Sequence, residues 1–369
     1  MRSKPRVFVT DGSYSHGLAA VRALGRAGYA VGVGERARVA APAVVAFWSR
    51  HCDARFVYPD PRNGTEKTAA ALARHFEEHS YDAAIPVSLD MVEVFILHRE
   101  MLRVPVMLPS AESFRIASDK RFTYPHARSV GVPVPATVPA ARWQELSPPI
   151  VFKHRRAGAI VARSATEAAR FASNAGTAID EYVAQEYIEG RNGFGYFALF
   201  QDGREAAYFM HERLVQYPQD GGPSVVARSI RDERLRILGK ELLTSLHWHG
   251  PAMVEFKRSD RDGELYLMEI NPKLWGSLDL AIAAGCNFPV WIARAVIDGA
   301  GPANGAYAEG LTYQWLMPNG LRAFLRYPEL RAAFVHNVLR PEVKTDLCWT
   351  DPLPTTLGLL SMSVSTIRR

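Results

Sequence analysis

Short apolar runs alternate with amphipathic segments over the first 110 residues of the chain. Continuous apolar runs are typical of parallel strands that are covered on both faces, whereas amphipathic helices repeat apolar positions every three or four residues. The alternation therefore predicts a doubly wound α/β domain at residues 1–110. The expected strands are 6–10, 29–33, 82–87 and 104–108, and the expected helices are 17–28, 67–79 and 90–102.

After Pro109 the pattern changes to an α+β region, in which helices mix with antiparallel strands. A hairpin is expected where two apolar strands, 251–257 and 264–270, flank the turn Asp260-Arg261-Asp262-Gly263. Residues 301–369 have a weak pattern and form a C-terminal extension whose role the sequence leaves open. The other expected helices are 111–130, 232–246 and 277–299, and the other strands are 149–153, 159–163, 182–186, 194–200 and 206–210.

Charge and composition narrow the class of protein. The chain has 44 Lys and Arg against 38 Asp and Glu, and these basic residues are scattered without a long block. Such a mild excess suits an anionic small molecule and argues against a nucleic-acid tail. No apolar stretch is long enough to span a membrane, and the run at residues 6–10 is too short for a signal peptide. We therefore expect a cytoplasmic protein with no nucleic-acid or membrane partner, and its three separated cysteines agree with a reducing compartment.

The expected hairpin carries the most specific chemistry. Glu255 lies on its first strand, and Glu269 and Asn271 lie on its second. Because side chains alternate faces along a strand, Glu269 and Asn271 point the same way, and Glu255 can oppose them. Two carboxylates and an amide oxygen form a set of hard ligands for Mg²⁺ that leaves positions for phosphate oxygens. The alternative is a pair of solvated carboxylates on an edge strand.

The hairpin and several segments before it resemble the ATP-grasp superfamily. Glu255-Phe256 and the segment Met268-Glu269-Ile270-Asn271-Pro272-Lys273 resemble its metal-binding signature. The other matching segments, in order, are Ser118-Asp119-Lys120, the spacer 131–137 (GVPVPAT), Val151-Phe152-Lys153 and 185–190 (QEYIEG). The resemblance covers about residues 6–300. Within the superfamily it is greatest to carboxylate–amine ligases related to carbamoyl-phosphate synthase large-subunit modules, through segments 221–224 and 274–278.

The resemblance implies a pre-ATP-grasp domain at 1–110, followed by a two-lobed ATP-grasp domain at 111–300. The small lobe would cover about 125–188 and the large lobe about 189–300. Lys120 and Lys153 would contact the phosphates, and a short loop with Arg155, Arg156 and Gly158 would cover them. The implied adenine contacts are Gln185, Glu186, Tyr187 and Ile188, and Asn192 stands where relatives often carry a ribose-binding carboxylate, with Glu189 as a nearby substitute.

Further cations and small residues are expected around the reacting groups. Lys273 stands where most relatives carry arginine, and it loses the bidentate geometry of a guanidinium. Arg213 and Arg228 flank the loop 221–224 and are candidates for the γ-phosphate or a substrate carboxylate, with surface arginines as the alternative. The expected substrate contacts are Ser13, His16, Ser224, Gly276 and Ser277. The loop that carries Ser13 and His16 departs from the GxGxxG pattern of dinucleotide sites, and helix capping is its alternative role.

The activity that the resemblance implies is an ATP-dependent carboxylate–amine ligase that forms an acyl phosphate and releases ADP and phosphate. Its cofactors would be ATP and Mg²⁺, or Mn²⁺ in its place. Its partners would be a small-molecule carboxylate and an amine, whose identities the sequence does not determine, and a second copy of the chain in a homodimer is an alternative to a monomer. Other interpretations are a kinase or carboxylase of the same fold, or a nucleotide sensor with a decayed active site.

Overall fold

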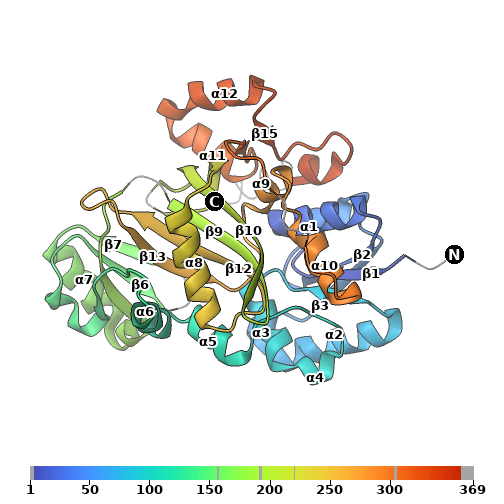
Figure 1. The fold of residues 1–369 in the computed structure, drawn as a ribbon, viewed down its shortest axis with the longest axis horizontal. Coiled ribbons are helices and arrows are strands. Elements are labelled where there is room, and N and C mark those ends of the chain that lie inside the picture. Colours follow the sequence, from blue (N-terminus) through green and yellow to red (C-terminus); the bar gives the residue numbers. More distant parts are fainter. Residues whose placement is uncertain (1–3, 156–157, 191–192, 220, 303–305, 359–369) are drawn as a thin grey trace.

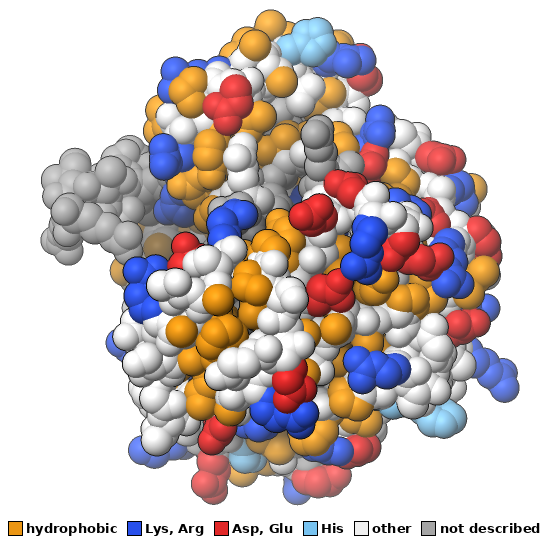
Figure 2. Space-filling model, turned by 90° about the vertical axis from the view of Figure 1, so that its left-hand side faces the viewer, with side chains coloured by type: hydrophobic (Ala, Val, Ile, Leu, Met, Phe, Trp, Pro, Cys, Tyr) orange, Lys and Arg blue, Asp and Glu red, His pale blue; other side chains and the backbone are white. Residues whose placement is uncertain are grey.

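The computed structural model describes residues 4–155, 158–190, 193–219, 221–302 and 306–358 of the 369-residue chain. These residues form three sheets with helices around them (Figure 1). The described part of the chain has no helix with the length and apolar character of a membrane span. Figure 2 shows one face of the molecule, on which acidic and basic side chains are interspersed.

The first sheet is parallel and has the strand order β3-β2-β1-β4. Apolar clusters lie on both of its faces, with Val7 and Val9 on one side and Phe8 on the other. The predicted doubly wound domain is therefore confirmed. Its strands are β1 (Arg6–Val9), β2 (Ala30–Arg36), β3 (Ala54–Tyr58) and β4 (Ala83–Ile85), and its helices are α1 (Ser15–Arg26), α2 (Thr65–His79), α3 (Leu89–Leu97) and α4 (Arg99–Leu102).

Two details of this domain differ from the prediction. The edge strand β3 was not expected, because its exposed and partly buried residues alternate and give no continuous apolar run. Residues 104–108 were expected to form a strand, but they contribute only an isolated bridge between Ala84 and Val106.

The second, small sheet is antiparallel and has the order β5-β8-β6-β7. One face packs against α7, where the rings of Phe152 and Phe171 stack at 4.2 Å. The opposite face carries Lys153 and Val183, which are register partners on β6 and β8. The elements of this region are α5 (Ala111–Ser118), α6 (Lys120–Ser129), β5 (Thr137–Pro139), β6 (Ile150–His154), β7 (Ala159–Ala162), α7 (Ala165–Ala175) and β8 (Tyr182–Glu186).

The third, large sheet has the order β13-β12-β9-β10-β11-β14-β15. Helix α8 packs on one face, and α9 and α10 pack between the other face and the first domain. Its strands are β9 (Gly193–Gln201), β10 (Arg204–Gln216), β11 (Ser224–Ser229), β12 (Gly250–Arg258), β13 (Leu265–Asn271), β14 (Thr312–Gln314) and β15 (Lys344–Thr345). Its helices are α8 (Glu233–Ser245), α9 (Leu278–Ala283), α10 (Phe288–Asp298), α11 (Asn319–Arg326) and α12 (Arg331–Leu339).

The structure refines two predictions for the large sheet. The helix expected at 277–299 is two helices, because Asn287 caps the second one and Pro289 lies in its first turn, where proline is tolerated. The segment beyond Gly301 adds β14 and β15 to the sheet, and these strands of three and two residues are too short to give a clear pattern. Single-turn 3₁₀ helices occur at Ala41–Ala43, Val45–Trp48, Pro61–Asn63 and Pro328–Leu330, and longer ones at Ala140–Glu145 and Gly176–Glu181.

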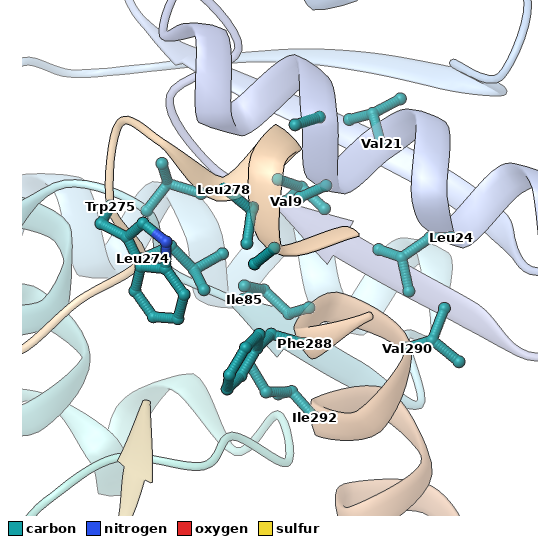
Figure 3. Packing of buried hydrophobic residues seen from close by; sticks show 14 of the residues in the cluster. Val9, Val21, Leu24, Ile85, Leu274, Trp275, Leu278, Phe288, Val290 and Ile292 are labelled. Carbon is teal, nitrogen blue, oxygen red and sulfur yellow. The ribbon is translucent and has the colours of Figure 1, made fainter. Parts of the chain in front are cut away.

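The segment that follows β13 joins the large sheet to the first domain. Figure 3 shows Leu274, Trp275 and Leu278 packed with Val9 and Ile85 of the parallel sheet. Full burial of each such side chain contributes about 1.5–3 kcal/mol. The backbone between Asn271 and Leu278 is therefore held in place from both domains.

Candidate active site

The expected ligand set is assembled at the β12–β13 hairpin. Glu255 and Glu269 are direct register partners, and Asn271 lies two residues beyond Glu269 opposite Met253. Cross-strand partners share a face, so the three polar side chains gather on one side of the sheet, as the alternation predicted. Asn271 Nδ2 donates to Glu269 Oε1 at 2.7 Å. Its amide oxygen is thereby left as an acceptor beside two carboxylates.

Two lysines from other elements converge on these carboxylates. Lys120 is the first residue of α6, after Asp119 at the N-cap, and its Nζ lies 3.7 Å from Glu269 Oε2. Lys153 reaches over from β6, and its Nζ donates to the Tyr124 hydroxyl at 3.1 Å and lies 3.5 Å from the Met268 carbonyl oxygen. Cations from a helix and from the small sheet thus face acids of the large sheet.

Burial and charge set the protonation of this cluster. Burial lowers the pKa of Lys153 to about 8, although Glu269 and Glu255 oppose the shift. For Glu269, burial alone would raise the pKa. The charges of Lys120, Lys153 and Lys273 and the hydrogen bond from Asn271 outweigh burial, so its pKa lies below the ordinary value. Near pH 7 the site therefore holds an ionised Glu269 and a largely protonated Lys153.

Arg213 is bound to the hairpin, whereas Arg228 is not. The Arg213 guanidinium forms a bidentate pair with Glu255, with Nη1–Oε1 and Nη2–Oε2 distances of 3.2 and 3.0 Å, and its Nε donates to Ser224 Oγ. Arg228 pairs with Glu212, whose strand neighbour is Arg213. Because adjacent strand residues point to opposite faces, Arg228 lies on the face opposite Glu255, and its surroundings agree with the alternative of a surface arginine and not with a contact to the γ-phosphate or a substrate carboxylate.

The expected adenine contacts form the end of β8 and the segment after it. Gln185 is buried and its Nε2 donates to Thr137 Oγ1, whereas Glu186 forms an ion pair with Arg261. The Lys257 ammonium lies 4.7 Å from the centroid of the Tyr187 ring. Within the described residues, the amide of the buried Ile188 has no backbone acceptor, so it is available to a ligand edge.

The loops expected to hold the ribose and cover the phosphates are described only in part. Asn192 and Arg156 lie outside the described residues. Arg155 forms an ion pair with Glu181, at the start of β8, and its carbonyl accepts from the Lys120 amide at 3.1 Å. Gly158 has φ +74°, a left-handed conformation that favours glycine. The backbone after Lys153 is therefore tied to the start of α6.

The first domain brings a second group of polar side chains to the site. His16 is buried with no hydrogen-bond partner for Nδ1, and burial followed by the nearby Lys273 charge lowers its pKa to about 3. Burial also lowers the Lys273 pKa, against the opposing charges of Glu269 and Asp11. Its Nζ donates to the Leu274 carbonyl at 3.3 Å. The Ser13 amide donates to the buried carboxylate of Glu35 at 2.8 Å.

Two of the expected substrate residues have other surroundings. The Ser277 hydroxyl is buried and lies 2.7 Å from His211 Nε2, so it is engaged rather than accessible. Gly276 is exposed, and an added Cβ would meet nothing within 4 Å, so no close approach requires glycine there. Another expected substrate residue, Ser224, accepts a hydrogen bond from Arg213 Nε through its hydroxyl.

Sequence reasoning missed His211 and Asp11. His211 is buried two residues before Arg213, so both lie on the face of the large sheet that carries Glu255. Strand alternation from Arg213 could have indicated it. Asp11 lies two residues after β1 with φ +56°, which is uncommon for a residue other than glycine, and it accepts from the Ser88 amide at 2.9 Å. Its position at the carboxyl edge of a parallel sheet was the available signal.

The donor chemistry of the hairpin fits a hard divalent cation. No group of three or more His, Cys, Asp or Glu side chains gathers as a metal site in the described parts of the chain. The candidate set is instead two carboxylates and one amide oxygen. Mg²⁺ is commonly held by one or two carboxylates together with phosphate oxygens and water. Glu255, Glu269 and Asn271 satisfy this pattern.

Comparison with known proteins gives one family match, to the part of the chain that contains this site. Residues 225–318, about a quarter of the chain, match a family described as "ATP-grasp in the biosynthetic pathway with Ter operon". This segment contains the hairpin with both carboxylates. No curated protein matches the sequence.

Solved structures match over most of the chain at low sequence identity. An L-amino acid ligase from Bacillus licheniformis has a TM-score of 0.63 and 15% identity, over 80% of this chain and 75% of its own. A second match is the biotin carboxylase domain dimer of Hydrogenobacter thermophilus 2-oxoglutarate carboxylase, with MgADP, ADP and bicarbonate. Its TM-score is 0.64 and its identity 14%, over 85% of this chain and 74% of its own. N5-carboxyaminoimidazole synthetase from Staphylococcus aureus, with ADP, has a TM-score of 0.65 and 14% identity, over 85% of this chain and 81% of its own. The chain therefore shares its fold with these three proteins, and its residues 225–318 match an ATP-grasp family.

Proposed function

We propose that this chain is an ATP-dependent carboxylate–amine ligase that works through an acyl phosphate. The observation that carries the proposal is the Glu255–Glu269–Asn271 set facing Lys120 and Lys153. An oxygen ligand set opposite two cations suits a metal-bound triphosphate. The ATP-grasp fold and the neighbouring L-amino acid ligase support the same reaction class.

The position of each side chain in the site indicates which part of the nucleotide or metal it would bind. Lys120 and Lys153 neutralise phosphate charge from two sides, and the segment 185–188 takes the adenine edge. Glu255, Glu269 and Asn271 would hold Mg²⁺, which supplies charge neutralisation at the β- and γ-phosphates when bound. Such preorganised charge in a partly buried site is a large source of rate enhancement.

The first domain and the segment after β13 would hold the substrate carboxylate. Lys273 is kept in place by the burial of Leu274 and Trp275, and it lies close enough for its charge to lower the pKa of both Glu269 and His16. We assign Lys273 to the phosphoryl group as it moves to the carboxylate. His16 stays neutral near pH 7, because its pKa is about 3, and it presents an unpartnered nitrogen rather than a charge.

Arg213 would act after the nucleotide arrives. In the described structure it neutralises Glu255 with a bidentate pair. If Glu255 held Mg²⁺, the metal would neutralise the carboxylate in place of Arg213. The guanidinium could then pair with the γ-phosphate or with a substrate carboxylate. Its fork geometry suits either group.

The partners of this reaction are a small carboxylate and an amine, and we place it in the cytoplasm. A homodimer is part of the proposal, since the neighbouring 2-oxoglutarate carboxylase domain is described as a dimer. Two neighbouring structures are a carboxylase domain with bicarbonate and a carboxyaminoimidazole synthetase. Bicarbonate is therefore the second candidate for the phosphorylated carboxyl group, which makes carboxylation the alternative function.

The experiment is a product analysis with a panel of amino acids, other carboxylates and bicarbonate. A carboxylate oxygen attacks the γ-phosphorus and ADP leaves, and then the amine displaces phosphate from the acyl carbon. One ¹⁸O atom of a labelled carboxylate should therefore appear in inorganic phosphate, with ADP and an amide formed in equal amounts. Release of AMP and pyrophosphate would refute the acyl phosphate and indicate adenylation.

A further inference from the structure

A second cavity, of about 320 Å³, lies between α6 and the β5–β8 side of the small sheet. Its volume falls within the range of small-molecule pockets, about 300–1,000 Å³. One wall is a face of α6, and the other is β5 with the start of β8. The residues that line it are Lys120, Arg121, Tyr124, Pro125, Arg128, Thr137, Val138, Pro139, Ala140, Asp180, Tyr182 and Val183.

This cavity adjoins the proposed nucleotide site and shares Lys120 with it. No residue of β6, β12 or β13 lines it. Tyr124 forms the partition, because its ring lines the cavity while its hydroxyl donates to the Met268 carbonyl at 2.7 Å and accepts from Lys153. Lys120 lies at the boundary, since it also lines a small cavity beside Glu269 and Asn271.

The charge of the lining is unbalanced. Three cations, Lys120, Arg121 and Arg128, face one carboxylate, Asp180. Arg121 is neutralised by Asp119 at 2.7 Å. The exposed guanidinium of Arg128 has no hydrogen-bond or ion-pair partner within the described residues, so it can take an anion without breaking a contact.

The rest of the lining is largely apolar. Val138, Pro139 and Val183 lie on the strand side, and Pro125 and the Tyr124 ring lie on the helix side. Apolar walls that include an aromatic residue, next to an unpaired guanidinium, suit a ligand with an aromatic body and one negative group. We infer that this cavity is a second ligand site, for a small aromatic carboxylate or a similar organic anion.

Occupancy of this cavity should also act on the nucleotide site, a consequence that rests on the proposed function. An anion that reaches Lys120 competes for the ammonium that otherwise faces Glu269 and the phosphates. The ligand should therefore weaken ATP binding, and ATP should weaken ligand binding by the same factor. We expect a severalfold effect, because Lys153 remains with the nucleotide.

Direct binding in the absence of nucleotide tests the site, so its result does not depend on whether the chain is a ligase. The probe is 1-naphthoate, titrated by calorimetry, with uncharged 1-naphthalenemethanol as its partner. We expect 1-naphthoate to bind with a submillimolar Kd and the alcohol to bind at least about tenfold more weakly, as expected for loss of a charge-assisted hydrogen bond. No heat with millimolar 1-naphthoate, or equal affinity for the two probes, would overturn the inference.

Variants locate the bound probe. Arg128→Gln should weaken 1-naphthoate binding at least about tenfold, and Pro139→Trp, at the register partner of Val183, should abolish it by filling the cavity. Arg74→Gln, an exposed arginine on α2, is the matched control and should bind as the wild type does. Unchanged binding in Arg128→Gln would place the probe elsewhere and refute the site. Because Arg128 is exposed, this test stands even if Pro139→Trp does not fold.

Discussion

Glu269→Gln tests the metal and phosphate site most directly. Glutamine has the same size and can still accept the hydrogen bond from Asn271, so the substitution removes one charge and little else. At the 3.7 Å separation from Lys120, an effective dielectric constant of 20 gives an upper bound of roughly 4.5 kcal/mol for the pair. The Glu269 side chain is 38% exposed, and the pair is therefore worth only about 1 kcal/mol to stability. The fold should survive.

The effect on turnover should be much larger. The variant loses one of two carboxylates that neutralise the metal, and it leaves three lysines less balanced. We expect kcat to fall by at least ~10²-fold, equivalent to about 2.7 kcal/mol of barrier, with a raised requirement for Mg²⁺. The assay is ATP-dependent phosphate release over a Mg²⁺ titration, with thermal unfolding measured in parallel.

Glu264→Gln is the matched control for this prediction. Glu264 lies on the same hairpin immediately before β13, and its ion pair with Arg234 is about half exposed on both sides. Its loss should leave turnover within about twofold of the wild type. Near-normal activity of Glu269→Gln at saturating Mg²⁺ would refute the assignment of the hairpin as the metal site, whereas a parallel loss in Glu264→Gln would indicate damage to the hairpin as a whole.

Four further changes test other parts of the site. Lys273→Met should lower kcat more than ATP affinity, and Lys273→Arg should restore part of the activity; an unchanged kcat with a raised KM would make Lys273 a ground-state binding residue. Burial lowers the Lys153 pKa to about 8, so the wild type should lose ATP affinity as the pH rises through 8, and equilibrium binding to Lys153→Met should lack this dependence. Arg213→Met removes the cation that neutralises Glu255, and it should lower kcat by ~10–10²-fold while Mg²⁺ binding to the nucleotide-free protein tightens; an unchanged kcat would remove Arg213 from the reaction. Burial, with the charge of Asp346, raises the Asp279 pKa from 3.8 to about 6. The folded protein therefore favours the protonated carboxyl group, and the free energy of unfolding falls as the pH rises through 6 and this group ionises. Asp279→Asn should therefore raise the thermal midpoint by ~2–5 °C at pH 8 and by less at pH 5, and an equal shift at both values would contradict this origin.

The arrangement of the proposed metal ligands could be predicted because it is local. Glu255, Glu269 and Asn271 lie on two strands joined by one turn, so the period of two and the turn signal determine which side chains share a face. The resemblance of the segments around Lys120 and Lys153 to ATP-grasp motifs predicted these two lysines as phosphate contacts. The structure places both beside the hairpin.

The partners of the arginines could not be predicted in the same way. Arg213 and Arg228 flank the same loop, but strand register places one at Glu255 and the other at Glu212. Register across β10 and β11 depends on which residues pack on each face of the large sheet. The sequence analysis did not predict β11, so it could not supply this register.

By itself, the sequence determined the alternation of strands and helices, the hairpin and the side of it on which the carboxylates lie. These features depend on residues within one element or one turn, where periodicity and turn chemistry act directly. Only the tertiary structure decided that His16 and Lys273 lie close together, that Ser277 is bonded to His211, and that a cavity lies behind Tyr124. Each of these features joins segments that are distant in sequence, and their meeting depends on how the buried surfaces of separate elements fit together.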